Sequence, residues 1–432
     1  MSDAPVVSGA RRKAALGFIF VVALLDVISL GIMIPVLPNL IKEFTGGDTA
    51  QAATINVLFA SAWGVMQFFG APLMGLVSDR FGRRPTLLVS MFSLGLDFLF
   101  MALAPTLAWL FVGRLINGFF AASFATANAY IADVTEPENR AKAFGLMGAA
   151  FGAGFILGPP LGGLLAESTL FGLLAEPSLR TPFFVAAGLC ALNGLYGLSI
   201  LPESLPRERR ARHWDWRRAN PLGSVKLLRS HPDLSGLASV NFLFQLAHNV
   251  LPSIFILYSG YRYGWSPATV GLTMVLTGVC NVLVQALLVG PTVKRLGERG
   301  ALLFGLAAGA IGFAWFAWAP TGAIYLLASP VFALSGLIGP GLQGLMTRRV
   351  SPSEQGQLQG ANSMLMGVAN IIGPAIFGLT FAWSISDGAS LHAPGLAIYV
   401  AAGLLLAAML IALRVARPVA APGGAASASV AS

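Results

Sequence analysis

Twelve long apolar runs, each close to the length that crosses a bilayer, dominate this sequence. A spanning helix needs about 20 largely apolar residues. Only 10% of the residues are charged and 56% are hydrophobic, which leaves too few charges to cover a soluble protein. The runs lack the alternation of barrel strands, so we expect an all-α membrane protein. We place the spans at 14–41, 53–77, 86–105, 107–131, 143–166, 182–202, 232–258, 268–292, 300–319, 322–346, 357–383 and 394–413.

The positions of Lys and Arg predict the orientation of the chain. With the N-terminus inside, 23 of the 27 basic residues fall in inside loops. The exceptions are Lys42, Arg180 and Arg262 in outside loops and Arg114 within a span. This asymmetry follows the positive-inside rule, so we expect both termini in the cytoplasm and the protein in the inner (plasma) membrane. The same bias, with anionic lipid at the inner face, explains the net charge of +9 without nucleic-acid binding.

One pattern is written twice, 215 residues apart. GLVSDRFGRRP at 75–85 has a counterpart in GPTVKRLGERG at 290–300. Because the offset contains six spans, an even number, both halves have the same orientation. Parallel six-helix repeats are the architecture of major facilitator transporters, which bind substrate between the halves. Four further pairs share the offset: Gly145 and Gly360, Gly152 and Gly367, Gly158 and Gly373, and Pro159 and Pro374.

These features predict twelve transmembrane helices in two pseudo-symmetric six-helix bundles, at 1–202 and 231–416, in the major facilitator fold. The charged segment 203–230 is expected to be a cytoplasmic linker. The Ala/Gly/Ser/Pro-rich residues 417–432 are expected to form a disordered tail. The fold needs no second copy, so we expect a monomer.

The charged loop at 75–85 has the composition of a cytoplasmic gate. Gly75 is expected to end its helix, and Gly82 to allow a tight turn. Asp79 is expected to cap a helix N-terminus of the other half, and Asp133 to pair with Arg83, a bidentate donor. The alternative is that the arginines only obey the positive-inside rule. The gate candidates are Gly75, Asp79, Arg80, Gly82, Arg83, Arg84 and Asp133.

The span at 143–166 carries the pattern G-x8-G-x3-GP-x2-GG. Small residues let helices approach closely, and Pro159 removes a backbone hydrogen bond. A Gly-rich packing helix without a coupling role is the alternative. The pattern resembles the helix 5 motif of proton-driven drug antiporters, just as 75–85 resembles the loop 2–3 signature of the major facilitator superfamily. Its residues are Gly145, Gly154, Gly158, Pro159, Gly162 and Gly163.

Longer segments resemble the tetracycline-resistance efflux family along nearly the whole chain. Among them are LLDVISLGIMIPVLP (24–38), LGLDFLF (94–100), YIADVT (130–135) and GPPLGGLL (158–165). The resemblance implies efflux of an amphipathic drug from the cytoplasm in exchange for an inbound proton, with no cofactor. If the drug is tetracycline, a divalent cation chelated by it would travel with it.

The C-terminal half departs from that family at two positions. The tetracycline carriers have an acid in helix 9, where this chain has Gly309, and a His in helix 8, where it has Asn281. Gln285, one turn along, matches the family. Tetracycline and a broader set of drugs therefore both stay open as substrates.

Three charged residues stand within spans: Asp26, Asp97 and Arg114. An intramembrane charge costs about 2.5–3.5 kcal/mol on the insertion scale and indicates function by default. We expect the two carboxyl groups to carry the coupled proton or bind substrate, with Arg114 approaching to displace the proton. A structural salt bridge with Arg114 is the alternative. The family resemblance implies the functional role, because its members use these positions.

Amide and imidazole groups in the spans are further candidates. Most transmembrane amides join helices, but some must line the substrate cavity. His248 is either a hydrogen-bonded packing residue or a second proton carrier. The cavity candidates are Gln67, Asn117, Gln245, His248, Asn281 and Gln285.

Two other functions use the same observations. A proton-coupled importer of sugars or organic acids would share the fold, but the helix 5 motif argues against it. A membrane enzyme would need a convergent catalytic or metal-binding cluster, whereas the four His are scattered along the chain. We therefore expect a secondary active transporter without catalytic residues or a metal site.

Overall fold

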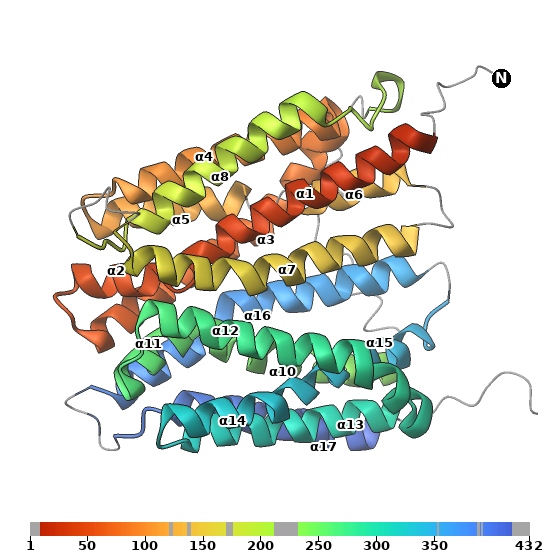
Figure 1. Ribbon diagram of the computed structural model, residues 1–432. Helices are drawn as coiled ribbons and strands as arrows, with labels where there is room; N and C mark the ends of the chain where they lie inside the picture. Colours follow the sequence, from red (N-terminus) through yellow and green to blue (C-terminus); the bar gives the residue numbers. More distant parts are fainter. Residues whose placement is uncertain are drawn as a thin grey trace, which may run out of the picture.

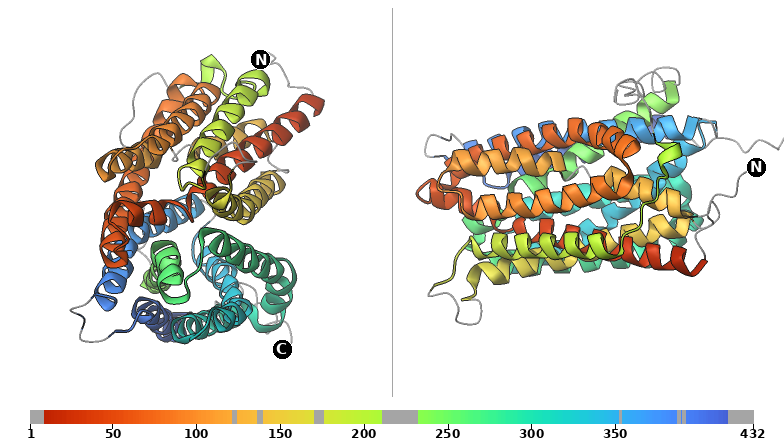
Figure 2. Two further views of the ribbon diagram at one scale, coloured as in Figure 1. Left: turned by 60° about the vertical axis from the view of Figure 1, so that its left-hand side comes forward. Right: turned by 90° about the horizontal axis from the view of Figure 1, so that it is seen from above.

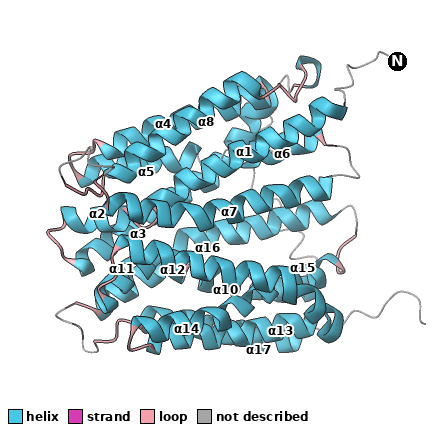
Figure 3. Cartoon of the chain, viewed as in Figure 1, coloured by secondary structure: helices cyan, strands magenta, loops and turns pink. Residues whose placement is uncertain are grey.

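The computed structural model describes residues 9–120, 124–135, 140–169, 176–210, 232–351, 354–386, 389 and 392–416. Within these ranges the chain is helical and contains no strand (Figure 3). The predicted tail at 417–432 and most of the predicted linker, 211–231, lie outside the described residues.

Each half contributes a succession of helices. The first half contains α1 (Gly9–Met33), α2 (Leu37–Phe44), α3 (Thr49–Phe81), α4 (Arg83–Ala102), α5 (Leu107–Phe120), α6 (Phe124–Val134), α7 (Arg140–Glu167), α8 (Thr181–Ile200) and the short η3 (Arg207–Arg209). The second half contains α10 (Pro232–His248), α11 (Val250–Tyr263), α12 (Pro267–Leu283), η5 (Val284–Leu288), α13 (Val289–Trp318), α14 (Gly322–Ala333), η6 (Leu334–Leu337), α15 (Ile338–Thr347), α16 (Gln355–Ser384) and α17 (Leu396–Val415).

The helices account for all twelve predicted spans. Among the described residues, 10 helices are long and apolar enough to cross a membrane. One of them, Pro267–Trp318, has 52 residues and contains the two spans predicted at 268–292 and 300–319. The span predicted at 107–131 corresponds to α5 and α6, on either side of 121–123. The all-α membrane fold with twelve helices is therefore confirmed.

Two predicted spans are broken rather than continuous. Between α1 and α2 the chain turns at 34–36, where Pro35 has no N–H to continue the helix. Between α10 and α11 the break falls at Asn249, with Pro252 in the first turn that follows. A proline within an apolar run does not reveal whether the helix kinks or breaks, since packing against neighbours decides this.

The helices lie in two groups, α1–α8 and α10–α17, with their axes running in broadly the same direction (Figures 1 and 2). Across the groups, α3 packs on α16 and α7 packs on α12. The largest hydrophobic cluster runs through both groups, and a smaller one joins α1, α4, α6 and α7 around Tyr130.

The two groups close on each other at the end of the bundle where α3 begins and α7 ends. There, Asn56 donates to the Ser253 carbonyl at 3.2 Å, and Ser61 donates to the Ile371 carbonyl at 3.0 Å. We call this the closed end. Near the opposite end, a Cβ atom built on Gly75, Gly148 or Gly152 would meet nothing within 4 Å.

Candidate functional site

Asp26 lies two turns before the end of α1 and is buried, with 6% of its surface exposed. The Asn193 amide of α8 donates to Asp26 Oδ1 at 3.4 Å and to the Val22 carbonyl at 3.0 Å. Among the described residues, no basic nitrogen lies within 4.0 Å of the Asp26 carboxyl oxygens, which is the limit for an ion pair. Asp26 is thus a buried carboxyl group held by an amide and not by a cation.

Asp97 on α4 is more deeply buried, with 2% of its surface exposed. The Asn117 amide of α5 donates to Asp97 Oδ2 at 3.1 Å, whereas Asp97 Oδ1 has no hydrogen-bond partner in the described part of the chain. Asn117 in turn accepts the indole N–H of Trp63, on α3, at 3.1 Å. One hydrogen-bonded chain therefore joins α3, α5 and α4 and ends at a carboxyl group.

Arg114 lies one turn before Asn117 on α5 and is also buried. Its guanidinium carbon lies 5.5 Å from the centre of the Trp63 ring, and Nη1 lies 3.7 Å from Met33 Sδ. It interacts electrostatically with Asp97, but no ion pair joins the two side chains within 4.0 Å. The salt bridge that the sequence left as an alternative is therefore not formed.

The glycine pattern of α7 fixes the place of α1. A Cβ atom at Gly158 would lie 2.7 Å from Gly31 Cα, and one at Gly154 would lie 2.6 Å from Val27 Cβ, next to Asp26. Gly162 abuts Ile32, and on another face Gly163 abuts Pro267 of α12. The motif thus packs α7 closely against the helix that carries Asp26 and against the other half. Gly145 and Pro159 also lie on α7, which continues through Pro159.

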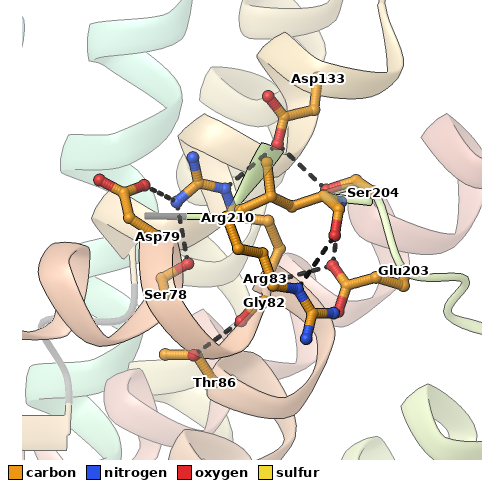
Figure 4. A network of polar contacts seen from close by, with 10 residues as sticks. Ser78, Asp79, Gly82, Arg83, Thr86, Asp133, Glu203, Ser204 and Arg210 are labelled. Carbon is orange, nitrogen blue, oxygen red and sulfur yellow. Dashed lines mark hydrogen bonds and ion pairs between the residues drawn. The ribbon is translucent and has the colours of Figure 1, made fainter. Parts of the chain in front are cut away.

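The loop between α3 and α4 forms a polar network (Figure 4). Arg83 binds Asp79 (Nη1–Oδ1, 2.6 Å) and Asp133 (Nε–Oδ2, 3.1 Å), so the predicted pair of Arg83 and Asp133 is confirmed. Glu203, directly after α8, accepts the backbone N–H of Arg83 at 2.9 Å and pairs with Arg210 at 3.2 Å. The network ties this loop to the end of α6 and to the start of the predicted linker.

One prediction about this loop is wrong. Gly75 does not end the helix, because α3 continues to Phe81; a Cβ atom built on Gly75 would meet nothing within 4 Å. Asp79 pairs with Arg83 within its own half; its contact with the other half stays a prediction. Gly82 does make the turn, with φ of 112°. Of the other two candidates, Arg80 lies over the ring of Phe81 and Arg84 donates to the Leu198 carbonyl.

The second copy of the loop has an equivalent ion pair with the charges reversed. Arg348 binds Glu298 (Nη2–Oε1, 2.8 Å), and each of these residues lies 215 positions after its counterpart in the Arg83–Asp133 pair. Gly297, equivalent to Gly82, also has a positive φ of 70°. The missing Asp of the second copy therefore does not remove the ion pair that ties the start of the helix after the loop to the end of a later helix, α6 in the first half and α15 in the second.

His248 is a packed and hydrogen-bonded residue. Its Nδ1 lies 3.0 Å from the Phe244 carbonyl and its Nε2 lies 3.3 Å from Ser335 Oγ. Its ring stacks on Phe332 at 5.6 Å. Position 309 is equally filled, because a Cβ atom on Gly309 would lie 3.0 Å from Ser335 Cβ.

The amide candidates divide into two groups. Asn117 is fully buried and belongs to the hydrogen-bonded chain rather than to a cavity wall, which corrects its prediction. Gln67 and Gln245 are half-buried, while Asn281 and Gln285 are exposed on α12 and η5. Gln285 donates to the Gly336 carbonyl at 3.2 Å. The candidates with at least partly exposed side chains are therefore Gln67, Gln245, Asn281 and Gln285.

Other amides join helices of the second half. Asn241 of α10 donates to Asn362 of α16 at 2.9 Å, and Asn249 donates to Asn370 at 3.1 Å. The two contacts lie eight residues apart along α16 and along the segment formed by α10 and Asn249, which directly follows it. Amide contacts of this kind hold transmembrane helices together.

Known proteins with similar sequences identify the family. The sequence pattern of the Major Facilitator Superfamily matches residues 19–374 and 237–431. The chain is 39% identical over 385 residues to the class C tetracycline resistance protein of Escherichia coli, covering 88% of this chain and 92% of that protein. This chain belongs to the tetracycline-resistance family of the Major Facilitator Superfamily. The class G protein of Vibrio anguillarum is 36% identical over 381 residues, covering 88% and 92%.

Solved structures agree on the fold. The crystal structure of the human organic anion transporter MFSD10 superposes with a TM-score of 0.66 at 23% identity, covering 93% of this chain and 99% of that one. Membership of this superfamily makes the chain a multi-pass transporter and not an enzyme.

Three residues that position the site side chains are not among the candidates predicted from the sequence. Asn193 holds Asp26, Trp63 holds Asn117, and Glu203 holds Arg83. Asn193 was detectable as an amide within a span. Trp63 and Glu203 carried no signal, because a membrane Trp is ordinarily apolar packing and Glu203 is one acid in a strongly charged segment.

Proposed function

We propose that this protein is a proton-coupled antiporter that exports amphipathic drugs, tetracycline-like or broader, by alternating access. The observation that carries the proposal is the pair of buried carboxyl groups in the first half, Asp26 and Asp97, neither of which is neutralised by an ion pair. An uncompensated charge in this position is expensive, so each group is suited to bind and release a proton. The tetracycline resistance proteins that the chain resembles support the drug as cargo.

The conformation supports a direction of transport. The positive-inside rule indicates that the loop at 75–85 is cytoplasmic, so the closed end faces outward, and the end where Cβ atoms on Gly75, Gly148 and Gly152 would meet nothing within 4 Å faces inward. Drug enters from the cytoplasm in this state. Both termini then lie in the cytoplasm, and the protein works as a monomer in the inner membrane.

Proton exchange follows from the position of Arg114. Its guanidinium is buried and rests on Trp63 rather than on a carboxylate. A movement of α5 relative to α4 would bring it to Asp97 and displace the proton, because an adjacent cation favours the ionised carboxylate. Drug and proton would thereby bind to the first half alternately.

The second half sets the range of drugs. Asn281 and Gln285 are neutral hydrogen-bonding groups, and a Cβ atom at position 309 would already lie 2.9 Å from Leu405 Cδ1 and 3.0 Å from Ser335 Cβ. In the described residues, no group of three His, Cys, Asp or Glu could hold a metal ion. A divalent cation would therefore enter as part of a tetracycline chelate, as cargo.

The test is drug accumulation in cells that lack their own efflux pumps. Wild type should lower the accumulation of tetracycline or of unrelated cationic and neutral drugs, and an uncoupler should abolish this effect. Asp26→Asn and Asp97→Asn should behave like empty vector, whereas Glu43→Gln, an exposed acid, should behave like wild type. Efflux that survives the uncoupler contradicts proton coupling, and growth-promoting uptake of a sugar or organic acid would indicate an importer.

A further inference from the structure

Trp63 contacts the Asp97 site in two different ways. Its indole N–H binds Asn117 Oδ1 at 3.1 Å, and its ring face lies 5.5 Å from the Arg114 guanidinium carbon. Arg114 and Asn117 stand three residues apart, on one face of α5. A single side chain of α3 therefore touches both of the α5 residues that interact with Asp97.

The indole contact determines which way the Asn117 amide points. An indole N–H can only donate, whereas an Asn side chain has one accepting and one donating end. While Trp63 donates to Asn117 Oδ1, the amide must present Nδ2 to Asp97 Oδ2, as found at 3.1 Å. Without the indole N–H, the amide could turn and present its oxygen, which accepts a hydrogen bond from a neutral carboxyl group and repels a carboxylate.

The backbones around these three side chains are closely packed in this conformation. A Cβ atom on Gly118 would lie 2.7 Å from the Trp63 carbonyl oxygen, so α3 and α5 touch directly at this level. On the other side, a Cβ atom on Gly113 would lie 3.2 Å from Asp97 Oδ1. Close contacts between the helices therefore hold the three side chains together in the conformation that precedes any movement of α5.

We propose that Trp63 is a positioning residue for proton exchange: it fixes the orientation of the Asn117 amide and the resting place of Arg114, and so sets how Asp97 exchanges its proton. The inference rests on the proposed function. In the proposed exchange, the Asn117 amide holds Asp97 Oδ2. The proton binds to Asp97 Oδ1, which has no partner among the described residues.

The surroundings of Asp97 contain few other charges. The titratable or charged groups that face it are Arg114 on α5 and Cys190 on α8, which also interacts with Asp26 on α1. On α6, Tyr130 and Asp133 lie by Arg84 and Arg83 instead. α3 has no charged residue before Asp79. The contribution of α3 to the surroundings of Asp97 is therefore the Trp63 indole and not a charged side chain.

The experiment compares wild type with Trp63→Phe in proteoliposomes. Phe keeps an aromatic face for Arg114 but has no N–H. The probe is tetracycline with Mg²⁺, or ethidium if wild type does not carry tetracycline, and the readout is drug-driven proton exchange as a function of pH. We expect the pH of half-maximal exchange to rise by about one unit, because a lost donor disfavours the carboxylate. The drug KM should stay within about twofold, since the change is at the proton site.

Three comparisons make the result decisive. Trp109→Phe, an exposed Trp on α5, should leave the pH profile unchanged. Asn117→Leu, or Asn117→Ser if the leucine variant does not assemble, should shift the profile in the same direction, and adding Trp63→Phe should shift it no further. A uniform loss of rate at every pH, or an unchanged profile, overturns the inference. Drug transport by wild type without proton exchange would instead overturn the proposed function.

Discussion

Glu167, the last residue of α7, accepts the backbone N–H of Ala268 at 2.9 Å, although the two residues belong to different halves of the protein. Ala268 lies in the first turn of α12, where backbone N–H groups have no partner within the helix and the helix dipole favours an anion. Glu167 therefore caps a helix of the opposite half. The sequence predicts such a cap between the halves for Asp79, which stays a prediction, and Glu167 makes one at the closed end.

Removing this cap should open the closed end more often. A hydrogen bond to a charged group contributes about 1.5–3 kcal/mol, and the exposure of Glu167 reduces this to about 1 kcal/mol. We expect a cysteine at the buried position Ala268 to react about fivefold faster with a membrane-impermeant maleimide in the Glu167→Ala background. Glu176→Ala, an exposed acid at the same end, is the control. Equal labelling rates would show that the bond does not hold the halves together.

The same substitution at two glycines of α7 should have opposite effects. Ala is favoured over Gly in a helix by about 0.5–1 kcal/mol, and a Cβ atom on Gly152 meets nothing within 4 Å. Gly152→Ala should therefore raise the thermal stability slightly and preserve transport. Gly158→Ala should lower the stability by about 1–3 kcal/mol, because its Cβ atom would lie 2.7 Å from Gly31 Cα.

Thermal unfolding of the purified protein with drug-efflux assays checks both glycine variants. Transport by Gly158→Ala at the wild-type rate would mean that α1 shifts to accommodate the methyl group. That result would remove the motif from any account of where Asp26 lies.

The two equivalent ion pairs should differ in strength. Arg83 in the first pair is 12% exposed, whereas Arg348 in the second is 66% exposed. Exposed pairs contribute about 0–1 kcal/mol, so a double-mutant cycle on unfolding should give about 1 kcal/mol of coupling for Arg83 with Asp133. The same cycle for Arg348 with Glu298 should give close to zero. A larger value for the second pair would contradict the role assigned to burial.

His248 should not be needed for proton coupling. Both ring nitrogens have hydrogen-bond partners, and the ring packs among Phe244, Phe313 and Phe332. His248→Gln keeps hydrogen-bonding capacity without a group that titrates near neutral pH. We expect an unchanged number of protons per drug in proteoliposomes, with Asp97→Asn as the comparison that loses exchange. A lower ratio in His248→Gln would identify His248 as a second proton carrier.

Features that depend on local composition can be predicted from the sequence. Apolar run length predicted twelve spans, and the 215-residue repeat predicted equivalent elements such as Gly82 and Gly297. The pairing of Arg83 with Asp133 is also predictable, because Arg83 begins one helix and Asp133 lies at the end of another on the same side of the membrane. Length, periodicity and charge bias act over one helix or one loop, so they can be read without knowing the neighbours.

The contacts that those residues make depend on how the helices pack. Asp97 and Arg114 were singled out as charges, but their separation beyond ion-pair distance and the link through Trp63 and Asn117 depend on the register of three helices. The closed end likewise depends on which glycines of α7 face α1 and α12. Within a bilayer almost every apolar residue is compatible with a spanning helix, so contacts between helices, and not composition, select the working geometry.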